Sequence, residues 1–566
     1  MKILIIYPYC LEGRLHEEDI SVMPIGAYYV GALLRENGHN AELLNFYNFN
    51  NVHEKIRAAL EEKQPDVIGF SILHANRWGG VEIAKIAREV NPGVKIVFGG
   101  IGATFLWKHL LTHFKVIDFI VLGEGEHTFL RLIESLRKQD HDAIENIRGI
   151  AFRKGAEIVR TESPEPVKNL DDLPVPANHF TYQHVSLTRG CPGNCTFCGS
   201  PRFWQRKVRF HSPDYFVNQL EILSKRGVSF FYVSDDTFTL KKQYVLDVCQ
   251  KILERNLCIT WAAISRVDHV DEDILYWMRK AGCIQISYGV ESGSEKIRKQ
   301  LGKNISTEQI RNAFSLTTKY GILARAYFIY GCPGETWETI QESIDLINEI
   351  KPMSVIFYIL DIFPGTELYA DFGKKFLAGR GKGDLDDIWT QKIEDIMYFE
   401  SDPNLSQEQV LAFGQKLRAS FYENLRHYAD AIELTDKKEF CQTHSDFLSR
   451  LGMTFSHGDY ARNRAIRDKD QIARNLYEKA LSYYPDHRAY LGLGVILQKS
   501  RDYVESVEIL SKGVAHFPEN ESLNMSLGIS YMNLEKYVKA LPHFLKFERS
   551  EQAAYYVNAC QKALKN

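Results

Sequence analysis

The sequence predicts an α/β protein with three parts: a doubly wound, Rossmann-like domain, a partial barrel of six β/α units, and an all-helical repeat domain. Short Val- and Ile-rich runs alternate with helical stretches at the start, a second such series follows, and strand signals then stop. We therefore expect a Rossmann-like domain over 1–145, a linker over 146–180, the barrel over 181–400, a helical connector over 401–455 and repeats over 456–566.

The first domain is predicted from buried strand runs such as KILIIY, DVIGFSIL and KIVFGG, each separated from the next by a helical stretch. Parallel sheets of this kind bind ligands beyond the carboxyl ends of their strands. Those ends carry small or flexible residues, namely Ser71, Gly99, Gly100, Gly123 and Glu124. Because glycine lets the backbone approach a ligand closely, we expect a wide, flat ligand there. A dinucleotide is disfavoured, since the G-x-G-x-x-G spacing after the first strand is missing.

The second β-α series starts with HVSLTRG, which leads into a cysteine loop. Later strand candidates are FFYVSDD, CITWAAISR, CIQISYGVES, RAYFIYG and SVIFYILDIF. Six strands with intervening helices predict an open, partial barrel. On such a scaffold the chemistry collects at the loops that follow the strands.

A weak repeat with a spacing near 34 residues marks the end of the chain. Leu493-Gly494 recurs as Leu527-Gly528, and Ala540 and Phe544 stand at small-then-aromatic positions. This pattern resembles a tetratricopeptide array, whose stacked helix pairs present a groove for peptides or partner proteins.

Composition and charge indicate the class of protein and its expected location. Hydrophobic residues make up 45% and charged residues 25% of the 566 positions, as in ordinary globular proteins. A net charge of −3 without a basic cluster argues against nucleic-acid binding. No apolar run is long enough to span a bilayer, and the start MKILIIYPYC is typical of a first strand rather than a signal peptide. We expect a cytoplasmic protein with no membrane partner.

Three of the ten cysteines form a cluster of their own. Cys191, Cys195 and Cys198 lie in TRGCPGNCTFCGSP, whereas the other seven are scattered and are expected to be small buried apolar residues. Closely spaced thiolates reach one metal centre from a single loop and select zinc or an iron–sulfur cluster. Structural zinc, the alternative, usually takes four ligands as two pairs, and no second pair stands at the expected distance. We expect a 4Fe–4S cluster with one iron lacking a protein ligand.

The C-x3-C-x-aromatic-C spacing, with Phe197 before the last cysteine, resembles the signature of the radical S-adenosylmethionine (SAM) superfamily over roughly residues 181–400. The resemblance implies that the amino and carboxylate groups of SAM chelate the open iron. It also implies that the reduced cluster splits SAM into methionine and a 5′-deoxyadenosyl radical, and that Phe197 lies near the adenine. No catalytic residue beyond the cluster ligands is assigned.

Four later segments match landmarks of the same superfamily: YVSDDTF, GVESGSE, FIYGCPGET and FPGTELY. The resemblance implies that Asp235 or Asp236 binds the methionine amino group, that Glu291 and Ser292 contact the ribose or the methionine, and that Gly331 leaves space near the adenine. For the two aspartates a turn or a helix cap is an equal alternative, because short acids at strand ends do both.

Residues 1–145 resemble the cobalamin-binding domain often fused to such enzymes, through GG-x-x-A-T at 99–104 and V-L-G-E-G-E at 121–126. The resemblance implies that the five strand-end residues named above bind cobalamin. The D-x-H-x-x-G motif that supplies an axial histidine is absent, and Gly102 stands where relatives often have histidine. We therefore expect no histidine below the cobalt; His74 is a remote candidate, and a solvated or capping histidine is the better interpretation. A Rossmann-type domain that has lost its ligand is the alternative.

Together the two resemblances imply a methylase. Cobalamin would take a methyl group from one SAM, a second SAM would give the radical, and an unactivated substrate carbon would be methylated. One alternative is a cobalamin-assisted cyclisation or rearrangement without net methyl transfer, and another is a scaffold that recruits partners through its repeats. The substrate is expected to be a small molecule or a carrier or peptide. A reductant such as flavodoxin or ferredoxin is implied by the family chemistry.

Overall fold

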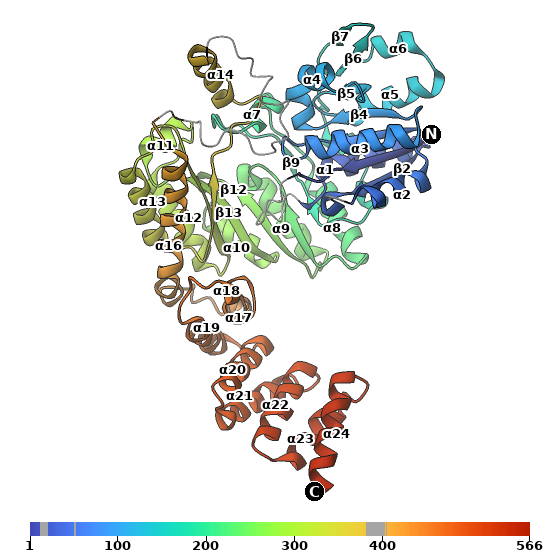
Figure 1. Cartoon of the computed structure of the whole chain (residues 1–566). Coiled ribbons are helices and arrows are strands. Elements are labelled where there is room, and N and C mark those ends of the chain that lie inside the picture. The colour runs from blue at the N-terminus through green and yellow to red at the C-terminus, as the bar shows by residue number, and fades with distance from the viewer. Residues whose placement is uncertain (12–20, 50–51, 381–401, 403, 566) are drawn as a thin grey trace.

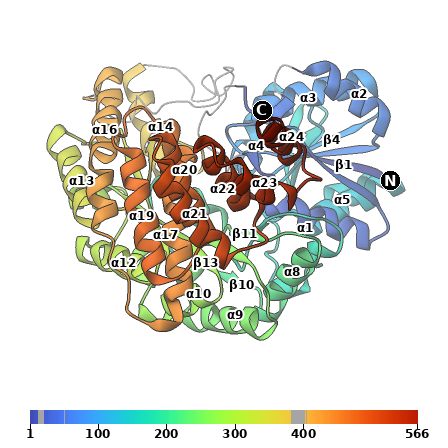
Figure 2. The same cartoon turned by 90° about the horizontal axis from the view of Figure 1, so that it is seen from below.

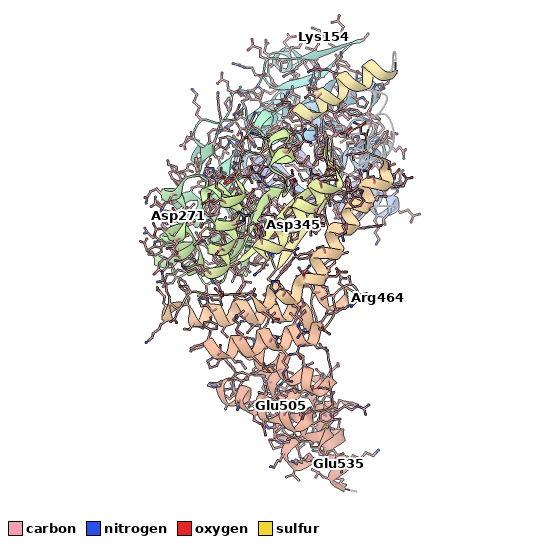
Figure 3. The ribbon with its side chains drawn as sticks, turned by 90° about the vertical axis from the view of Figure 1, so that its left-hand side faces the viewer. Lys154, Asp271, Asp345, Arg464, Glu505 and Glu535 are labelled. Carbon is pink, nitrogen blue, oxygen red and sulfur yellow. The ribbon has the colours of Figure 1, made fainter. Side chains whose placement is uncertain are left out.

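The computed structural model describes residues 1–11, 21–49, 52–380, 402 and 404–565. Two α/β parts lie side by side, and an arm of helices extends from the second of them (Figure 1). Figure 2 looks along this arm from below, and Figure 3 shows Arg464, Glu505 and Glu535 at successive positions along it. No helix within the described residues is long and apolar enough to cross a bilayer.

The first part is built on a seven-stranded sheet with the order β2-β1-β3-β4-β5-β6-β7. Its strands are β1 (Lys2–Tyr7), β2 (Asn40–Asn45), β3 (Val67–Ser71), β4 (Lys95–Gly99), β5 (Phe119–Val121), β6 (Ile150–Lys154) and β7 (Glu157–Arg160). Its helices are α1 (Ile25–Glu36), α2 (His53–Lys63), α3 (Arg77–Val90), α4 (Ile101–His113), α5 (Glu126–Lys138) and α6 (His141–Glu145). The first five strands are parallel.

Helices cover both faces of this sheet. Ile6 and Ile68 belong to one buried core, whereas Ile5 and Val67 belong to another, because successive strand residues point to opposite faces. The doubly wound arrangement predicted from the sequence is confirmed. The sheet also extends further than predicted, since β6 and β7 add two antiparallel strands where we expected the linker over 146–180 to begin.

The second part holds a six-stranded, all-parallel sheet with the order β15-β14-β13-β12-β11-β8. Its strands are β8 (His184–Val185), β11 (Phe230–Val233), β12 (Thr260–Ser265), β13 (Cys283–Glu291), β14 (Leu323–Tyr330) and β15 (Ser354–Ile359). The helices between these strands are α8 (Pro213–Lys225), α9 (Lys242–Glu254), α10 (Glu272–Lys280), α11 (Glu295–Gln300), α12 (Thr307–Lys319) and α13 (Trp337–Ile350), and α14 (Glu367–Arg380) follows β15. A short hairpin of β9 (Thr188–Arg189) and β10 (Arg209–Phe210), with α7 (Ser200–Phe203) between them, faces the first part.

The edge strands β8 and β15 do not pair with each other among the described residues, so the sheet stays open as expected for a partial barrel. Side chains alternate along β14, where Ala324, Ala326 and Phe328 are buried and the residues between them are half-buried. Period-two burial of this kind is what a curved sheet with helices on its outer face requires.

The remainder of the described chain is helical. Its helices are α16 (Gln407–Asp430), α17 (Cys441–Ser456), α18 (Asp459–Arg462), α19 (Lys469–Tyr483), α20 (His487–Lys499), α21 (Tyr503–His516), α22 (Glu521–Asn533), α23 (Tyr537–Leu545) and α24 (Glu551–Lys565). Helices α19, α21 and α23 begin at residues 469, 503 and 537, each 34 residues after the previous one. Helices α20 and α22 begin at 487 and 521, with the same spacing. The period seen in the sequence therefore matches a period of helix pairs.

Two glycines show why this period is visible in the sequence. A Cβ placed on Gly494 would lie 2.5 Å from Leu510, and a Cβ on Gly528 would lie 2.5 Å from Phe544. Both members of the second pair stand 34 residues after those of the first. Helices that touch this closely need glycine at each recurrence of the contact.

Gly528→Ala is expected to lower the free energy of unfolding by about 1–3 kcal/mol, because the added methyl group overpacks against the Phe544 ring. Gly26→Ala is the control, since Gly26 also lies in a helix, α1, but has open space around it. Alanine favours helix there, so this variant should be neutral or slightly more stable. Urea unfolding followed by circular dichroism measures both, and equal effects would contradict the prediction.

Candidate active site between the two sheets

A cavity of about 1230 Å³, counting its open mouth, lies between the two α/β parts. The first part lines it with the carboxyl ends of β3, β4 and β5, and the second part lines it with the β9 hairpin and α7. The five residues predicted to bind a flat ligand, Ser71, Gly99, Gly100, Gly123 and Glu124, all line this cavity. The structure brings them together because parallel strands end at one edge of their sheet.

Glycines shape the base of this edge. Gly100 has a φ of +94°, and a Cβ there would lie 2.7 Å from the carbonyl oxygen of Ile72. A Cβ on Gly102 would lie 2.6 Å from the carbonyl group of Leu73. The backbone of the β3–α3 loop thus leaves no room for a side chain at Gly102, and packing explains why glycine stands there.

His74 does not lie among the residues that line the cavity. Its ring is buried and stacks on Phe363, with 5.2 Å between the ring centroids. Burial, together with the charge of Arg77, lowers the pKa of His74 to about 3. The sequence interpretation of a solvated or capping histidine is therefore replaced by a buried, neutral one.

One wall of the cavity is a buried network of ion pairs that joins the two parts. Glu124 accepts hydrogen bonds from Arg189 (2.8 Å), Arg209 (2.7 Å) and the backbone N–H of Val167 (2.9 Å). Arg189 also donates to Glu126 (2.6 Å). Burial alone would raise the pKa of Glu124, but Arg209 and Arg189 hold it below its usual value. Glu124 therefore connects the first part to the strand that precedes the cysteine loop.

The cysteine loop lies between β9 and α7. A Cβ on Gly193 would lie 3.2 Å from the Cys191 sulfur and 3.9 Å from the Cys195 sulfur, so this glycine leaves a gap that both sulfurs flank. The Gly193 N–H donates to the Cys191 sulfur (3.4 Å). In the part of the chain that the structure describes, no three Cys, His, Asp or Glu side chains gather closely enough to share a single metal ion.

Two cations lie near these thiols. Burial raises the pKa of Cys195, and the charges of Lys303 and Arg266 oppose that rise. Burial also raises the pKa of Cys198, to about 12. Arg266 is held by a two-pronged ion pair with Asp268 (2.9 and 2.8 Å). A half-buried site that offers sulfur ligands beside fixed positive charge favours a centre bound by thiolates.

The structure separates the two predicted aspartates. Asp235 is buried, and its two oxygens accept hydrogen bonds from the backbone N–H groups of Leu187 (3.0 Å) and Thr188. It therefore holds the strand that leads into the cysteine loop, and burial raises its pKa to about 7. Asp236 instead lines the cavity and accepts a hydrogen bond from the Ser200 hydroxyl.

Glu291 and Ser292, at the end of β13, have partners within the protein. Glu291 forms a buried ion pair with Lys303 (2.9 Å), and its φ is +70°. The Ser292 hydroxyl accepts from the N–H of Ser294 (3.1 Å) and lies 3.4 Å from the Ser343 hydroxyl. Both residues thus brace the turn after β13, and Glu291 places the Lys303 ammonium near Cys195.

One small apolar cluster connects the surroundings of Phe197 and Gly331. The Phe197 ring packs against a small apolar cluster of Ile297, Leu301, Cys332 and Leu360. Gly331, next to Cys332, donates its N–H to the Glu335 carboxylate (2.6 Å). The cluster that Phe197 packs against therefore includes the residue that follows Gly331.

Comparisons with known proteins agree with this geometry. A model of the radical SAM superfamily matches residues 185–347, and a model of the B12-binding domain matches residues 20–133. An uncharacterized methyltransferase of Pyrococcus horikoshii is 30% identical over 382 residues, which cover 65% of this chain and 82% of the relative. This chain belongs to the cobalamin-dependent radical SAM enzymes. Such enzymes use a 4Fe–4S cluster, SAM and cobalamin, and they need a substrate and a reductant.

Two further proteins resemble this radical SAM enzyme. The anaerobic magnesium-protoporphyrin IX monomethyl ester cyclase of Rubrivivax gelatinosus is 28% identical over 393 residues, covering 66% of this chain and 70% of the cyclase. The structure of the radical SAM methyltransferase TsrM from Kitasatospora setae, with cobalamin and a [4Fe-4S] cluster bound, superposes with a TM-score of 0.62. It covers 85% of this chain and all of TsrM at 16% identity, which supports the fold alone.

The sequence alone assigned no role to four charged residues of this radical SAM enzyme: Arg189, Arg266, Lys303 and Glu126. Arg189 stands directly before Gly190 and Cys191, and Glu126 is the second acid of the V-L-G-E-G-E segment. For Arg189 and Glu126, a position next to or within a recognised motif was the available signal. Their partners lie far away in the sequence, so the pairing could not be predicted.

Glu335→Gln is expected to flatten the pH dependence of stability. Glu335 is buried, its Oε2 accepts from the Gly331 and Cys332 N–H groups, and burial raises its pKa to about 7 from the usual 4.5. A raised carboxyl pKa stabilises the fold below pH 4.5, and this contribution is lost as the pH rises through about 7. From about pH 5 to about pH 8, the free energy of unfolding of the glutamine variant should rise by up to about 3 kcal/mol relative to that of wild type. Urea unfolding at both pH values measures this, and parallel pH profiles would contradict it.

Proposed function

We propose that this radical SAM enzyme methylates an unactivated carbon of an organic substrate. The observation that carries the proposal is the single cavity shared by the two parts. The predicted cobalamin residues line one side of it, and Arg189, Gly190 and Asp236, beside the cysteine loop, line the other. Two cofactors seated there would face each other across this cavity. The P. horikoshii relative, described as a methyltransferase, also supports the proposal.

We infer that Cys191, Cys195 and Cys198 bind the cluster. The three sulfurs fit a 4Fe–4S cluster, because each binds a different iron and they need not meet at one ion as zinc ligands do. Lys303 and Arg266 would offset the negative charge of the thiolates. When bound, the cluster and SAM supply a 5′-deoxyadenosyl radical, and cobalamin supplies the methyl group.

The geometry refines the predicted SAM contacts. Asp236 faces the cavity and is the better candidate for the methionine amino group, whereas Asp235 positions the cysteine loop. Phe197 and the backbone at Gly331 are the candidates for the adenine. Glu291 and Ser292 would act through Lys303 and the turn after β13.

We propose that Ser71, Gly99, Gly100 and Gly123 seat cobalamin without a histidine below the cobalt. His211 is the one histidine among the described residues that line the cavity. Its Nε2 is paired with the Tyr29 hydroxyl (3.0 Å) and its Nδ1 with Asp171 (3.1 Å), so both ring nitrogens are engaged within the protein.

We propose five units along the chain, as expected from the sequence, with the first sheet extended to Arg160. The helix pairs from 456 onward are interpreted as tetratricopeptide-like repeats that hold a carrier, a peptide or a partner protein. A cytoplasmic location and a flavodoxin- or ferredoxin-type reductant belong to the same proposal. All ten cysteines lie in the described residues, and none forms a disulfide, as a reducing compartment favours.

The second candidate is a radical cyclisation or rearrangement without net methyl transfer. The R. gelatinosus cyclase, matched over 66% of this chain, supports it. Both candidates share the cavity and the cluster, so only the product separates them.

The test uses anaerobically purified full-length enzyme assayed for iron, sulfide and cobalamin. The loaded, reduced enzyme is then incubated with methyl-labelled SAM and a metabolite extract of the source cells. Deoxyadenosine together with a labelled product supports methylation, whereas deoxyadenosine with an altered but unlabelled product supports the cyclase. Loaded enzyme that releases no deoxyadenosine would overturn both candidates.

A further inference from the structure

Two acidic residues of one turn behave differently at the wall of the cavity. Both oxygens of Glu124 are taken by protein donors, namely Arg189, Arg209 and the Val167 N–H. Glu126, the first residue of α5, uses only Oε1, which accepts from Arg189. Its Oε2 has no hydrogen-bond partner although the residue is only 3% exposed, and the residue lines the cavity.

A buried carboxylate oxygen without a donor is costly, so this atom requires a partner from the contents of the cavity. The charges of the network already balance, because Glu124 and Glu126 face two guanidinium groups, those of Arg189 and Arg209. The missing partner is therefore a neutral N–H or O–H donor rather than a cation. A ligand that brings such a donor against Oε2 would satisfy this oxygen.

We propose that Glu126, and not Glu124, is the carboxylate that binds the cofactor of this cavity, by accepting a hydrogen bond from an amide N–H or a hydroxyl. The proposal rests on the proposed function, which places cobalamin here. Cobalamin offers both kinds of donor, since amide groups surround its corrin ring and its nucleotide tail carries hydroxyl groups. Glu124 then has the different task of holding the two parts of the protein together.

The same carboxylate links the cavity to the cluster loop. Arg189, which Glu126 holds, ends β9 two residues before Cys191. The Arg189 guanidinium lies over the Tyr29 ring at 5.0 Å and over the Trp204 ring at 5.9 Å, and both rings line the cavity. A ligand bonded to Glu126 therefore lies one side chain away from the strand that enters the cysteine loop. Filling the cavity should favour one position of this loop, and binding at the two sites should be coupled.

The first test titrates hydroxocobalamin into full-length enzyme that carries a reconstituted cluster under anaerobic conditions. Glu126→Gln keeps an acceptor for Arg189 but presents an amide to the cavity, so the Kd should rise by at least about tenfold. Glu134→Gln is the matched control, because Glu134 lies on the same helix but outside the cavity. The Kd of this variant for hydroxocobalamin should stay within about twofold of the wild-type value.

Aquocobinamide, which lacks the nucleotide tail, identifies the donor. If Glu126→Gln weakens both ligands, the donor is a corrin amide, and if it weakens only cobalamin, the donor lies in the tail. An unchanged Kd for both ligands would overturn the proposal. Wild-type enzyme that binds no cobalamin would instead overturn the proposed function, so the two failures are distinguishable.

The coupling has its own readout, the low-temperature electron paramagnetic resonance spectrum of the reduced cluster with SAM. Hydroxocobalamin should change this spectrum in wild type and leave it unchanged in Glu126→Gln at saturating ligand. A wild-type spectrum that does not respond would refute the coupling. If the glutamine variant does not fold, Glu126→Asp keeps the charge for Arg189 but withdraws the oxygen from the cavity by one carbon–carbon bond. The same tenfold loss is expected for it, and wild-type affinity would overturn the proposal.

Discussion

Cys195→Ala is expected to abolish the cluster and, with it, the reductive cleavage of SAM. Cys195 lies between the other two cysteines in the loop, and its sulfur and that of Cys191 flank the gap at Gly193. Two remaining thiols leave half of a 4Fe–4S cluster without protein ligands. Bound iron should fall to the background of unreconstituted protein, and deoxyadenosine release should fall by at least about a thousandfold, because the cofactor carries the chemistry.

Cys249→Ala is the matched control for this prediction. Cys249 is buried in α9, in the core between the barrel sheet and its helices, and not in the cysteine loop. Removing its sulfur costs at most a small cavity, so iron content and deoxyadenosine release should remain at the wild-type level. A Cys195→Ala protein that retains iron and activity would refute the proposed ligand set.

The strand-end residues could be predicted because their convergence follows from local rules. Strands that run parallel end at one edge, so Ser71, Gly99 and Gly123 had to meet there once three buried strands were recognised. The repeat was visible for a similar reason, since the close contact of Gly494 with Leu510 recurs at Gly528 and Phe544. In the first case a general rule of parallel sheets places the residues, and in the second the contact repeats along the chain.

The different tasks of Asp235 and Asp236 could not be predicted. Successive residues after a strand point in opposite directions, and the sequence alone does not say which direction faces the ligand. The pairing of Val233 with Val185 decides it, because this register places Asp235 against the backbone N–H groups of Leu187 and Thr188. The pairing of two strands that are far apart in the chain therefore determines which aspartate contacts the backbone and which lines the cavity.

The β6–β7 hairpin was missed because a proline-rich stretch directly follows it. Its strands are short, and Lys154 and Glu157 flank a tight turn at Gly155. Such a segment carries little hydrophobic signal and gains its order from pairing with β5. Local propensity was weak here, and the neighbouring strand determined the structure.

Arg189→Met is expected to cause the largest loss of stability. The Arg189 side chain is 9% exposed and is shared by Glu124 and Glu126, which are themselves 7% and 4% exposed. Methionine fills part of the volume but leaves two buried carboxylates with a single guanidinium, that of Arg209. Removing one partner of a buried ion pair costs about 3–5 kcal/mol. We expect a loss of this size in the first unfolding transition, together with weakened contact between the two α/β parts.

Arg57→Met is the control that separates burial from charge. Arg57 also pairs with a glutamate, Glu89, but its side chain is 42% exposed, and pairs of this kind contribute about 0–1 kcal/mol. Urea unfolding of apoprotein, followed by tryptophan fluorescence and by limited proteolysis of the 161–183 segment, compares the two variants. Arg189→Met should unfold at lower urea and expose this segment to protease, whereas Arg57→Met should match wild type. If both variants match wild type, the two parts must be held together by their apolar contacts, and the ion-pair network would contribute no net stability to the interface.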